Sequence, residues 1–335
     1  MPSSSNQMAG KTMIAVSYGA YGGGAAALKH VEVQVPLPKK DEVLLKLEAA
    51  SLNPVDWKTQ KGNLWPLFPL RFPFIPVTDV AGEVIDVGSA VKNFKIGDKV
   101  VSMLNFMKGG GLAEYAVASS TLTVHRPPEV SPAEGAGLPI AASTALQALK
   151  SAGAKFDGTS KPLNILITAA SGGVGHYAVQ LAKLANLNVT ATCGARNMEL
   201  VKSLGADEVL DYKSSDGEML QSPSGKKYDA VIQCAAGVEW SVFEANLSEN
   251  GKVVVVTPNP MTFVKYALKR LSFAKKAAVP MVLMPKEEDL RFLVGLVKEG
   301  KMKTVVDSKH LLSNAGDAWA KCIDGHATGK IVIEM

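Results

Sequence analysis

The residues best suited to chemistry form a glycine cluster with the spacing Ala169-x-x-Gly172-x-x-Gly175. Gly172 would allow a tight turn and the close approach of a phosphate, and Gly175 would let the next helix pack against the preceding strand. The backbone N–H groups and the dipole of that helix would then face one point. The pattern predicts a pyrophosphate-binding turn, although a glycine-rich turn without a ligand is the alternative. The candidate residues are Ser171, Gly172, Gly173, Val174 and Gly175.

The segment after the next predicted strand indicates which dinucleotide binds. Proteins that bind NAD place an Asp or Glu there, which accepts hydrogen bonds from the ribose 2′-OH. This chain instead continues as Cys193-Gly194-Ala195-Arg196-Asn197, without a carboxylate. A guanidinium can bind a 2′-phosphate with two hydrogen bonds, whereas a carboxylate would repel it. We therefore expect NADPH in preference to NADH, with Cys193, Gly194, Arg196 and Asn197 close to it. A solvated surface arginine is the alternative.

A second group of polar residues follows another predicted strand, in the sequence SLNPVDWK. Pro54 ends that strand and fits the first turn of a helix, so Asn53, Asp56 and Lys58 should lie close together. An amide and an ammonium group could stabilise negative charge that develops on an oxygen. We regard these three residues as catalytic candidates. In the alternatives, Asn53 only caps the helix, and Asp56 pairs with Lys58 or another base.

Two predicted domains, one α/β and one rich in strands, must position these residues. Strands and helices alternate in the second half of the chain, which predicts an α/β fold with a doubly wound parallel sheet. Pro280 would confine the last of these strands to an edge of the sheet. The predicted strands are Leu163–Thr168, Asn188–Thr192, Glu208–Tyr212, Tyr228–Cys234, Gly251–Thr257 and Ala278–Met284, and the predicted helices include Ala142–Ser151 and Asn197–Leu204.

The first part of the chain instead predicts a small β-rich domain. Its last strand, Lys330–Glu334, should rejoin that domain because chain termini often lie close together. The segment Gly62–Pro76 is rich in proline and aromatic residues and predicts an irregular loop, either a lid, a contact surface or a packed loop. The other predicted strands are Met13–Tyr18, Val31–Val35, Glu42–Ala50, Thr78–Asp86, Asp98–Ser102 and Leu112–Ala118, with helices at Glu134–Ala136 and Glu287–Lys298.

Composition excludes several classes of protein. The chain is 47% hydrophobic and 20% charged, which argues against wholesale disorder. A net charge of +5 over 335 residues is too small to favour nucleic-acid binding. The N-terminus lacks the apolar core of a signal peptide and the arginines of a transit peptide, so we expect neither secretion nor a cleaved presequence. The 3 cysteines lie far apart and the 5 histidines are scattered, so we expect no metal and no disulfide.

Several segments together resemble the zinc-independent quinone oxidoreductases of the medium-chain dehydrogenase/reductase superfamily. The resemblance covers nearly the whole chain and follows the family's order. The segments are SLNPVDWK, TDVAGEV, GGGLAEYAVA, TALQAL, AASGGVGHYAVQLAK, SLGADEVLDY and ATGKIVI. Further segments, including CGARN, SPSGKKYDAV and AWAKCIDGHATGKI, resemble plant chloroplast-envelope members of the family.

This resemblance implies a GroES-like catalytic domain, residues 1–137 and 286–335, and a Rossmann cofactor domain, residues 138–285. It implies NADPH-dependent reduction of the C=C bond of α,β-unsaturated carbonyls, including long-chain oxylipin ketols. It also implies peripheral attachment to the stromal side of the chloroplast inner envelope without a cleaved transit peptide. Zinc alcohol dehydrogenases carry ligands where this chain has Asn53 and Thr78-Asp79, so no metal is expected.

The expected reaction adds a hydride to the β-carbon of an enone and leaves an enolate, which Asn53 or Lys58 would stabilise. The α-carbon would take a proton from water or Lys58. The resemblance places Thr144 beside the nicotinamide, although a core hydroxyl is the alternative. It also places Tyr212 near the adenosine phosphate. The remaining cofactor candidates, most of them at the carboxyl edge of the sheet, are Cys234, Ala235, Thr257, Pro258 and Lys330.

Two other functions stay open: reduction of quinones, and a nucleotide-binding scaffold or redox sensor with little catalysis. Residues 261–303 hold ten Lys or Arg against four Asp or Glu. Within them, FVKYALKRLSFAKKAAV could present a basic face to anionic lipid, unless it is a solvated helix. The predicted edge strand could pair with a second copy to form a homodimer.

Overall fold

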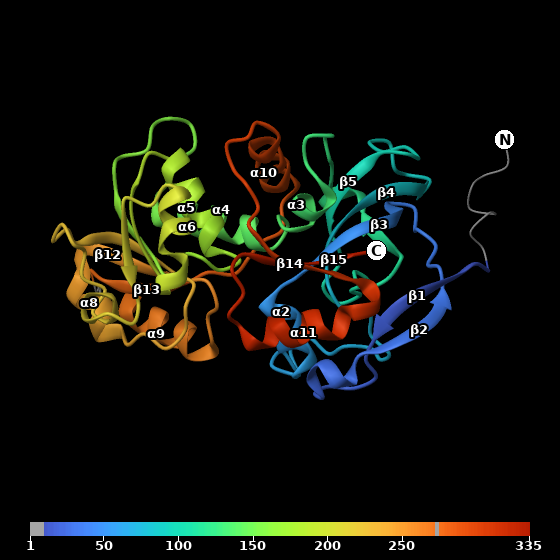
Figure 1. Ribbon diagram of the computed structural model, residues 1–335, viewed down its shortest axis with the longest axis horizontal. Helices are drawn as coiled ribbons and strands as arrows, with labels where there is room; N and C mark the ends of the chain where they lie inside the picture. The colour runs from blue at the N-terminus through green and yellow to red at the C-terminus, as the bar shows by residue number, and fades with distance from the viewer. Residues whose placement is uncertain (1–9, 272–274) are drawn as a thin grey trace. The chain divides into compact units, whose positions relative to one another are not determined.

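The computed structural model describes residues 10–271 and 275–335. It divides into two compact units (Figure 1). Unit 1 contains residues up to Ile140 together with Pro285–Met335, and unit 2 contains Ala141–Met284. Because unit 1 is built from both ends of the chain, unit 2 is an insertion into it.

Unit 2 is built on a six-stranded sheet with the order β10-β9-β8-β11-β12-β13, in which all neighbours are parallel. The order reverses between β8 and β11, and open α/β sheets bind ligands at the carboxyl ends of the strands at such a point. Residues such as Leu166, Val231 and Val254 are fully buried, as expected of strands covered on both faces. The strands are β8 Asn164–Ile167, β9 Asn188–Cys193, β10 Glu208–Asp211, β11 Tyr228–Gln233, β12 Leu247–Val255 and β13 Ala277–Pro280.

The helices of unit 2 alternate with these strands, which confirms the doubly wound arrangement. Strand β13 lies at the edge of the sheet, as predicted, but it ends at Pro280, so residues 281–284 of the predicted strand lie outside it. Its pairing with a second copy stays a prediction. The helices are α4 Ala141–Ala152, α5 Gly175–Leu184, α6 Met198–Ser203, α7 Ser215–Glu218, α8 Trp240–Asn246 and α9 Pro260–Leu271.

Unit 1 contains a seven-stranded sheet with the order β14-β15-β3-β4-β5-β7, in which β6 also pairs with β3. Strand β15 pairs antiparallel with β3, which confirms that the end of the chain returns to the first domain. A separate hairpin joins β1 Thr12–Ser17 to β2 Lys29–Gln34. The sheet strands are β3 Glu42–Leu52, β4 Asp79–Val87, β5 Lys99–Met103, β6 Tyr115–Ser119, β7 Thr123–His125, β14 Val306–Leu311 and β15 Lys330–Glu334.

Four α-helices flank this sheet, and one of them carries the largest buried side chain of the unit. Trp319 on α11 is fully buried, and its indole donates to Gln60 Oε1 on α2 at 3.0 Å. Neither β14 nor α11 was predicted from the sequence. The helices are α2 Pro54–Gln60, α3 Pro132–Ala136, α10 Glu287–Lys298 and α11 Ala315–Asp324.

The proline-rich segment Gly62–Pro76 is irregular, as predicted. Leu70 and Phe74 are buried, and Phe72 packs edge-on against Tyr21 at 4.9 Å between ring centroids. The large side chains earlier in the segment are exposed, with Trp65 at 62% and Leu67 at 81%. The segment is therefore packed at one end and presents apolar side chains to solvent at the other.

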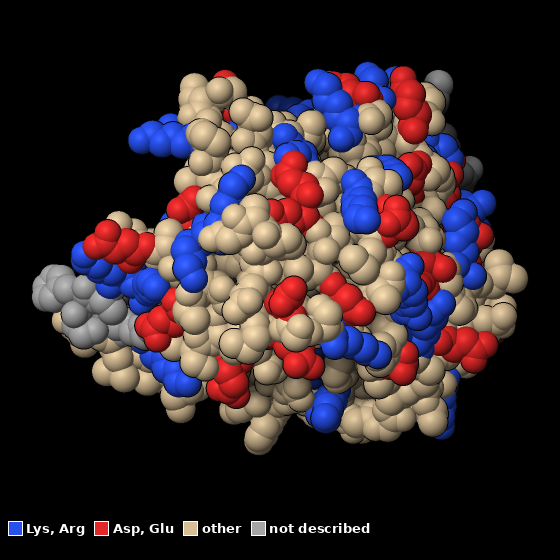
Figure 2. Space-filling model, turned by 60° about the vertical axis from the view of Figure 1, so that its left-hand side comes forward, with Lys and Arg blue, Asp and Glu red and all other residues tan. Residues whose placement is uncertain are grey.

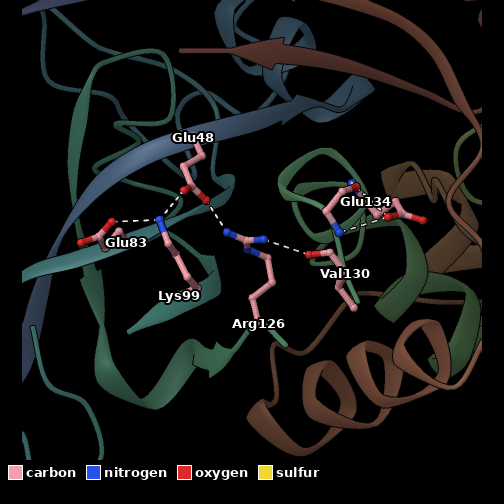
Figure 3. A network of polar contacts seen from close by, with 7 residues as sticks. Glu48, Glu83, Lys99, Arg126, Val130 and Glu134 are labelled. Atoms are coloured by element: carbon pink, nitrogen blue, oxygen red, sulfur yellow. Dashed lines mark hydrogen bonds and ion pairs between the residues drawn. The ribbon is translucent and has the colours of Figure 1, made fainter. Parts of the chain in front are cut away.

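A polar network joins β3 and β5 to the loop that leads into α3 (Figure 3). Glu48 on β3 pairs with Lys99 on β5 and with Arg126. The Arg126 guanidinium, which is largely buried, also donates to the carbonyl of Val130 at 2.9 Å. One side chain therefore fixes the course of residues 126–130, which lead to α3.

Arg126→Met should destabilise the protein by about 2 kcal/mol, because it leaves the buried Val130 carbonyl and the Glu48 carboxylate without this donor. The matched control is Lys309→Met, whose ion pair with Glu334 is exposed and should be worth less than about 0.5 kcal/mol. Urea denaturation measures both changes. Equal losses in the two variants would contradict this role of Arg126.

Candidate functional site

The glycine cluster forms a tight turn between β8 and α5. Ala169 has a left-handed backbone with φ of 48°, and Gly172 N–H donates to the Ala169 carbonyl at 2.9 Å. A Cβ on Gly175 would lie 2.3 Å from the Ala169 oxygen and 2.6 Å from Ala170 Cα. No side chain fits at Gly175, so this close approach of helix to strand requires glycine there. Gly173 and Val174 complete the turn.

Hydrogen bonds connect this turn to the ends of two neighbouring strands. Asn197 Nδ2 donates to Ser171 Oγ at 3.0 Å, which joins the turn to the segment after β9. Thr168 Oγ1 accepts from the backbone N–H groups of Cys234 and Ala235 at 3.0 and 3.1 Å, which joins β8 to the end of β11. Thr168, which the sequence analysis did not single out, therefore fixes the carboxyl edge of the sheet where its strand order reverses.

The residues after β9 lie beside the end of β10. Tyr212 N–H donates to the Cys193 carbonyl at 3.1 Å, and a Cβ on Gly194 would lie 3.5 Å from the Tyr212 ring. Lys213 Nζ lies 5.8 Å from the centroid of that ring. Arg196 and Lys213 are both exposed, one after β9 and the other after the adjacent strand β10. Lys213 was missed from the sequence, although its position directly after LDY was the available signal.

The cysteines at this edge are not reactive thiolates. Burial raises the pKa of the Cys193 thiol to about 11, and the Asp211 carboxylate adds to the effect. Burial alone raises the pKa of the Cys234 thiol to about 12. Both thiols are therefore protonated at neutral pH. The two residues contribute to this edge through backbone hydrogen bonds, in which the Cys193 carbonyl accepts from Tyr212 and the Cys234 N–H donates to Thr168.

The structure places the remaining predicted cofactor residues in two different surroundings. Thr144 is buried on α4, and Thr257 and Pro258 follow the carboxyl end of β12, all within unit 2. Lys330 belongs to unit 1, at the start of β15, and only 2% of it is exposed. Most of the predicted cofactor residues therefore share the carboxyl edge of one sheet, but Lys330 does not.

In unit 1, a buried polar cluster surrounds the junction of β3 and α2. Lys330 Nζ donates to the Leu52 carbonyl at 3.0 Å and to Asn53 Oδ1 at 2.6 Å. Asn53 Nδ2 donates to Asp79 Oδ2 at 2.9 Å, and Asn53 N–H donates to Asp56 Oδ2 at 2.7 Å. Both ends of the Asn53 amide are therefore engaged inside the protein.

The pKa values of the two carboxyl groups in this cluster are both raised. Burial raises the pKa of Asp56 to about 7 against the opposing effect of the Asn53 N–H, and Asp79 raises it further. Burial raises the pKa of Asp79 to about 6, although Lys330 and the Ile140 N–H oppose the change. Burial lowers the pKa of Lys330, and the nearby carboxylates partly offset this decrease.

Lys58 lies on α2 next to this cluster but in different surroundings. It is half-buried, and its Nζ lies 5.7 Å from the centroid of the Trp57 ring. The structure thus brings Asn53 and Asp56 into one hydrogen-bonded group with Asp79 and Lys330, whereas Lys58 packs along an aromatic ring. Within residues 10–271 and 275–335, no three His, Cys, Asp or Glu side chains gather as a metal site would require.

Comparison with known proteins agrees with this architecture. A family model for the alcohol dehydrogenase GroES-like domain matches residues 39–128, and one for a zinc-binding dehydrogenase matches residues 204–333. A quinone oxidoreductase from Coxiella burnetii has a similar structure, with a TM-score of 0.86 and 33% identity, covering 97% of this chain and 100% of that one.

Relatives of known name are similar over nearly their full length. The chain is 67% identical to the chloroplast envelope quinone oxidoreductase homolog of Arabidopsis thaliana, covering 98% of this chain and all of that one. It is 34% identical to the chloroplastic NADPH-dependent alkenal/one oxidoreductase of the same plant, covering 96% of this chain and 80% of that one. The chain therefore belongs to the quinone oxidoreductases of the medium-chain dehydrogenase/reductase superfamily, oxidoreductases that use a nicotinamide cofactor.

Proposed function

We propose that this protein uses NADPH to reduce the C=C bond of α,β-unsaturated carbonyls. The observation that carries the proposal is the turn at residues 169–175, together with Arg196 after β9 and Lys213 after β10 at the same end of the sheet. Two relatives support the type of substrate, since one is named an alkenal/one oxidoreductase and another, 36% identical, a 2-methylene-furan-3-one reductase.

The residues of unit 2 fit the proposed cofactor. Gly175 lets the N-terminus of α5 lie close to the backbone of Ala169 and Ala170. The backbone N–H groups at that N-terminus would bind the pyrophosphate. Arg196 and Lys213 would bind the 2′-phosphate, with Tyr212 alongside. We assign residues 138–285 to the cofactor domain, and residues 1–137 with 286–335 to the catalytic domain. NADPH, when bound, supplies a hydride.

Addition of hydride at the β-carbon of an enone leaves negative charge on the carbonyl oxygen. We assign the stabilisation of that charge to Lys58, because its ammonium group lies on α2 beside the Trp57 ring rather than within the buried cluster. Asn53, whose amide is already bound to Lys330 and Asp79, holds the loop from which α2 begins. Asp56 belongs to the same buried cluster.

Purified protein with NADPH and a panel of enones, ketols and quinones should convert the enones to saturated ketones, as measured by mass spectrometry. Quinone reduction is the second candidate function, because three relatives, 63–67% identical to this chain, are named as quinone oxidoreductases or their homologs. Formation of hydroquinones without any saturated ketone would favour it. NADPH binding without turnover of any substrate would indicate a nucleotide-binding scaffold or sensor.

Arg196→Ala and Lys213→Ala should each raise the KM for NADPH about tenfold, because each removes a charge-assisted contact to the 2′-phosphate. The KM for NADH should stay unchanged, since NADH lacks that phosphate. Lys202→Ala is the matched control, because Lys202 lies on α6 and pairs with Glu199. Equal changes in KM for both cofactors would contradict this assignment.

We place the protein at the chloroplast inner envelope, on its stromal side, as a peripheral protein. The support is the name of the Arabidopsis relative and the surface of α9, where Met261, Val264, Leu268 and Leu271 are all more than half exposed. Among the described residues, no helix has the length and apolarity to cross a membrane. Both signs of charge are interspersed over the face shown in Figure 2, so attachment would depend on a local segment.

Vesicles that contain anionic lipid should sediment the protein, and a variant that neutralises Lys269, Arg270, Lys275 and Lys276 should lose this binding. Residues 272–274 of the predicted basic segment and the side chains of Lys269 and Arg270 lie outside the described structure. Lys275 pairs with Glu249, which reduces the contribution of Lys275 to lipid binding. Unchanged sedimentation of the variant would show that this segment is not the anchor.

A further inference from the structure

Two neighbouring loops of unit 1 present apolar side chains to solvent. The first is the proline-rich segment, and the second, residues 104–111, follows β5. Phe68 of the first loop packs edge-on against Phe106 of the second, with 6.4 Å between the ring centroids. The two loops therefore form one surface, which we call the apolar tip. Its members with at least a third of their surface exposed are Trp65, Leu67, Phe68, Phe72 and Met107.

Backbone contacts hold the base of the apolar tip in place. Gly110 N–H donates to the Ile75 carbonyl at 2.8 Å, and Gly111 N–H donates to the Val77 carbonyl at 2.9 Å. A Cβ on Gly109 would lie 2.1 Å from the Ile75 oxygen, so this close approach of the two loops requires glycine there. The backbone of the tip is thus fixed before any contact forms, which lowers the entropy cost of binding.

The charged residues on the two loops all have the same sign. Both loops contain Lys or Arg but no Asp or Glu. Arg71 of the first loop is exposed, as is Lys61 directly before it, whereas Lys108 of the second loop pairs with Glu42 at 2.9 Å. Basic residues beside an apolar surface match the negative headgroups of anionic lipid.

The residue types favour a bilayer over a folded partner protein. Exposed apolar patches mark contacts with proteins or membranes, and Trp is enriched at the boundary between membrane and water. Trp65 and Leu67 project most of their surface into solvent. A folded partner would need a matching pocket for each of these side chains, whereas the acyl region of a bilayer accepts them in any arrangement.

We propose that the apolar tip inserts into the surface of a bilayer that contains anionic lipid, with Trp65 and Leu67 in the acyl boundary and Lys61 and Arg71 at the headgroups. Burial of apolar area and attraction to anionic lipid both add to the strength of such a contact. The proposal rests on the peripheral location proposed above, and it names a contact surface for that location on unit 1.

The first test uses the fluorescence of Trp65 in the full-length protein. The probe is vesicles of phosphatidylglycerol and phosphatidylcholine, with bromine on the acyl chains of the phosphatidylcholine. These vesicles should quench the emission of the wild type, and Trp65→Phe should lose this quenching while it still sediments with them. The less exposed Trp57, Trp240 and Trp319 supply the background emission. Equal quenching of wild type and Trp65→Phe, or none in either, overturns the proposal.

The second test removes the apolar contact. Trp65→Ser combined with Leu67→Ser should weaken vesicle binding about tenfold, because two apolar side chains no longer leave water. The matched control is Leu37→Ser combined with Ile96→Ser, which changes two side chains of unit 1 that are each 53% exposed and lie outside the two loops. The control should bind vesicles like the wild type, and both variants should keep the wild-type kcat in solution. Equal weakening in both variants overturns the proposal.

Other occupants of the apolar tip give different results. If it binds a second copy of the chain, the Trp65→Ser, Leu67→Ser variant turns a dimer into a monomer and keeps its vesicle binding. If it covers the substrate, that variant raises the KM for the enone and keeps its vesicle binding. Either result overturns the proposal.

The vesicle measurements also separate this contact from the earlier proposals. A wild-type protein that does not sediment with these vesicles overturns both the contact and the proposed location. A wild-type protein that sediments without quenching at Trp65 overturns the contact alone. If no enone is reduced, the proposed function fails, and the vesicle measurements still decide the contact.

Discussion

The structure of unit 2 depends on the close contact between the backbone at Ala169 and the start of α5. A Cβ at Gly175 would overlap the Ala169 oxygen, so any other residue would push the helix away from β8. That shift would also move Ser171, which binds Asn197, and Thr168, which holds the backbone after β11. The position of one helix terminus thus determines how the ends of three strands face a ligand.

Unit 1 buries several charged side chains at the junction of β3 and α2. The last strand returns Lys330 to the loop between β3 and α2, where it binds Leu52 and Asn53. Removal of one partner from a buried ion pair destabilises a protein by about 3–5 kcal/mol. The charged residues therefore hold the junction of β3 and α2 in one conformation. The same burial shifts the carboxyl groups toward neutral pH, which is the range where an acid can give up a proton and regain it.

Much of the fold could be predicted because its signals are local. The apolar strands, the glycine turn and the proline that confines β13 to an edge are each visible within a few residues. Strand β14 and helix α11 were missed because β14 alternates weakly and carries charged residues, and α11 begins with small residues. Their structure depends on tertiary contacts, such as that of Trp319 with Gln60.

The candidate site was predicted unevenly for the same reason. The residues of the turn and of the segment after β9 are consecutive, so their spacing was informative. The contacts of Thr168 with the backbone after β11, and the role we propose for Lys213, depend on which strands are neighbours in the sheet. The link between Asn53, Asp79 and Lys330 joins positions from three parts of the chain, and no local pattern indicates it. Asn53 and Asp56 were predicted correctly as neighbours, whereas Lys330 was proposed only as a cofactor residue and its contact with Asn53 was not predicted.

We propose above all that this fold delivers a hydride to the β-carbon of a conjugated carbonyl. NADPH that carries deuterium at C4 of the nicotinamide ring traces that transfer directly, with an enone as acceptor and mass spectrometry or NMR of the product. We expect a saturated ketone with the deuterium at its β-carbon and a solvent proton at its α-carbon. Deuterium at the carbonyl carbon of an alcohol, or an enone recovered unchanged, would contradict it.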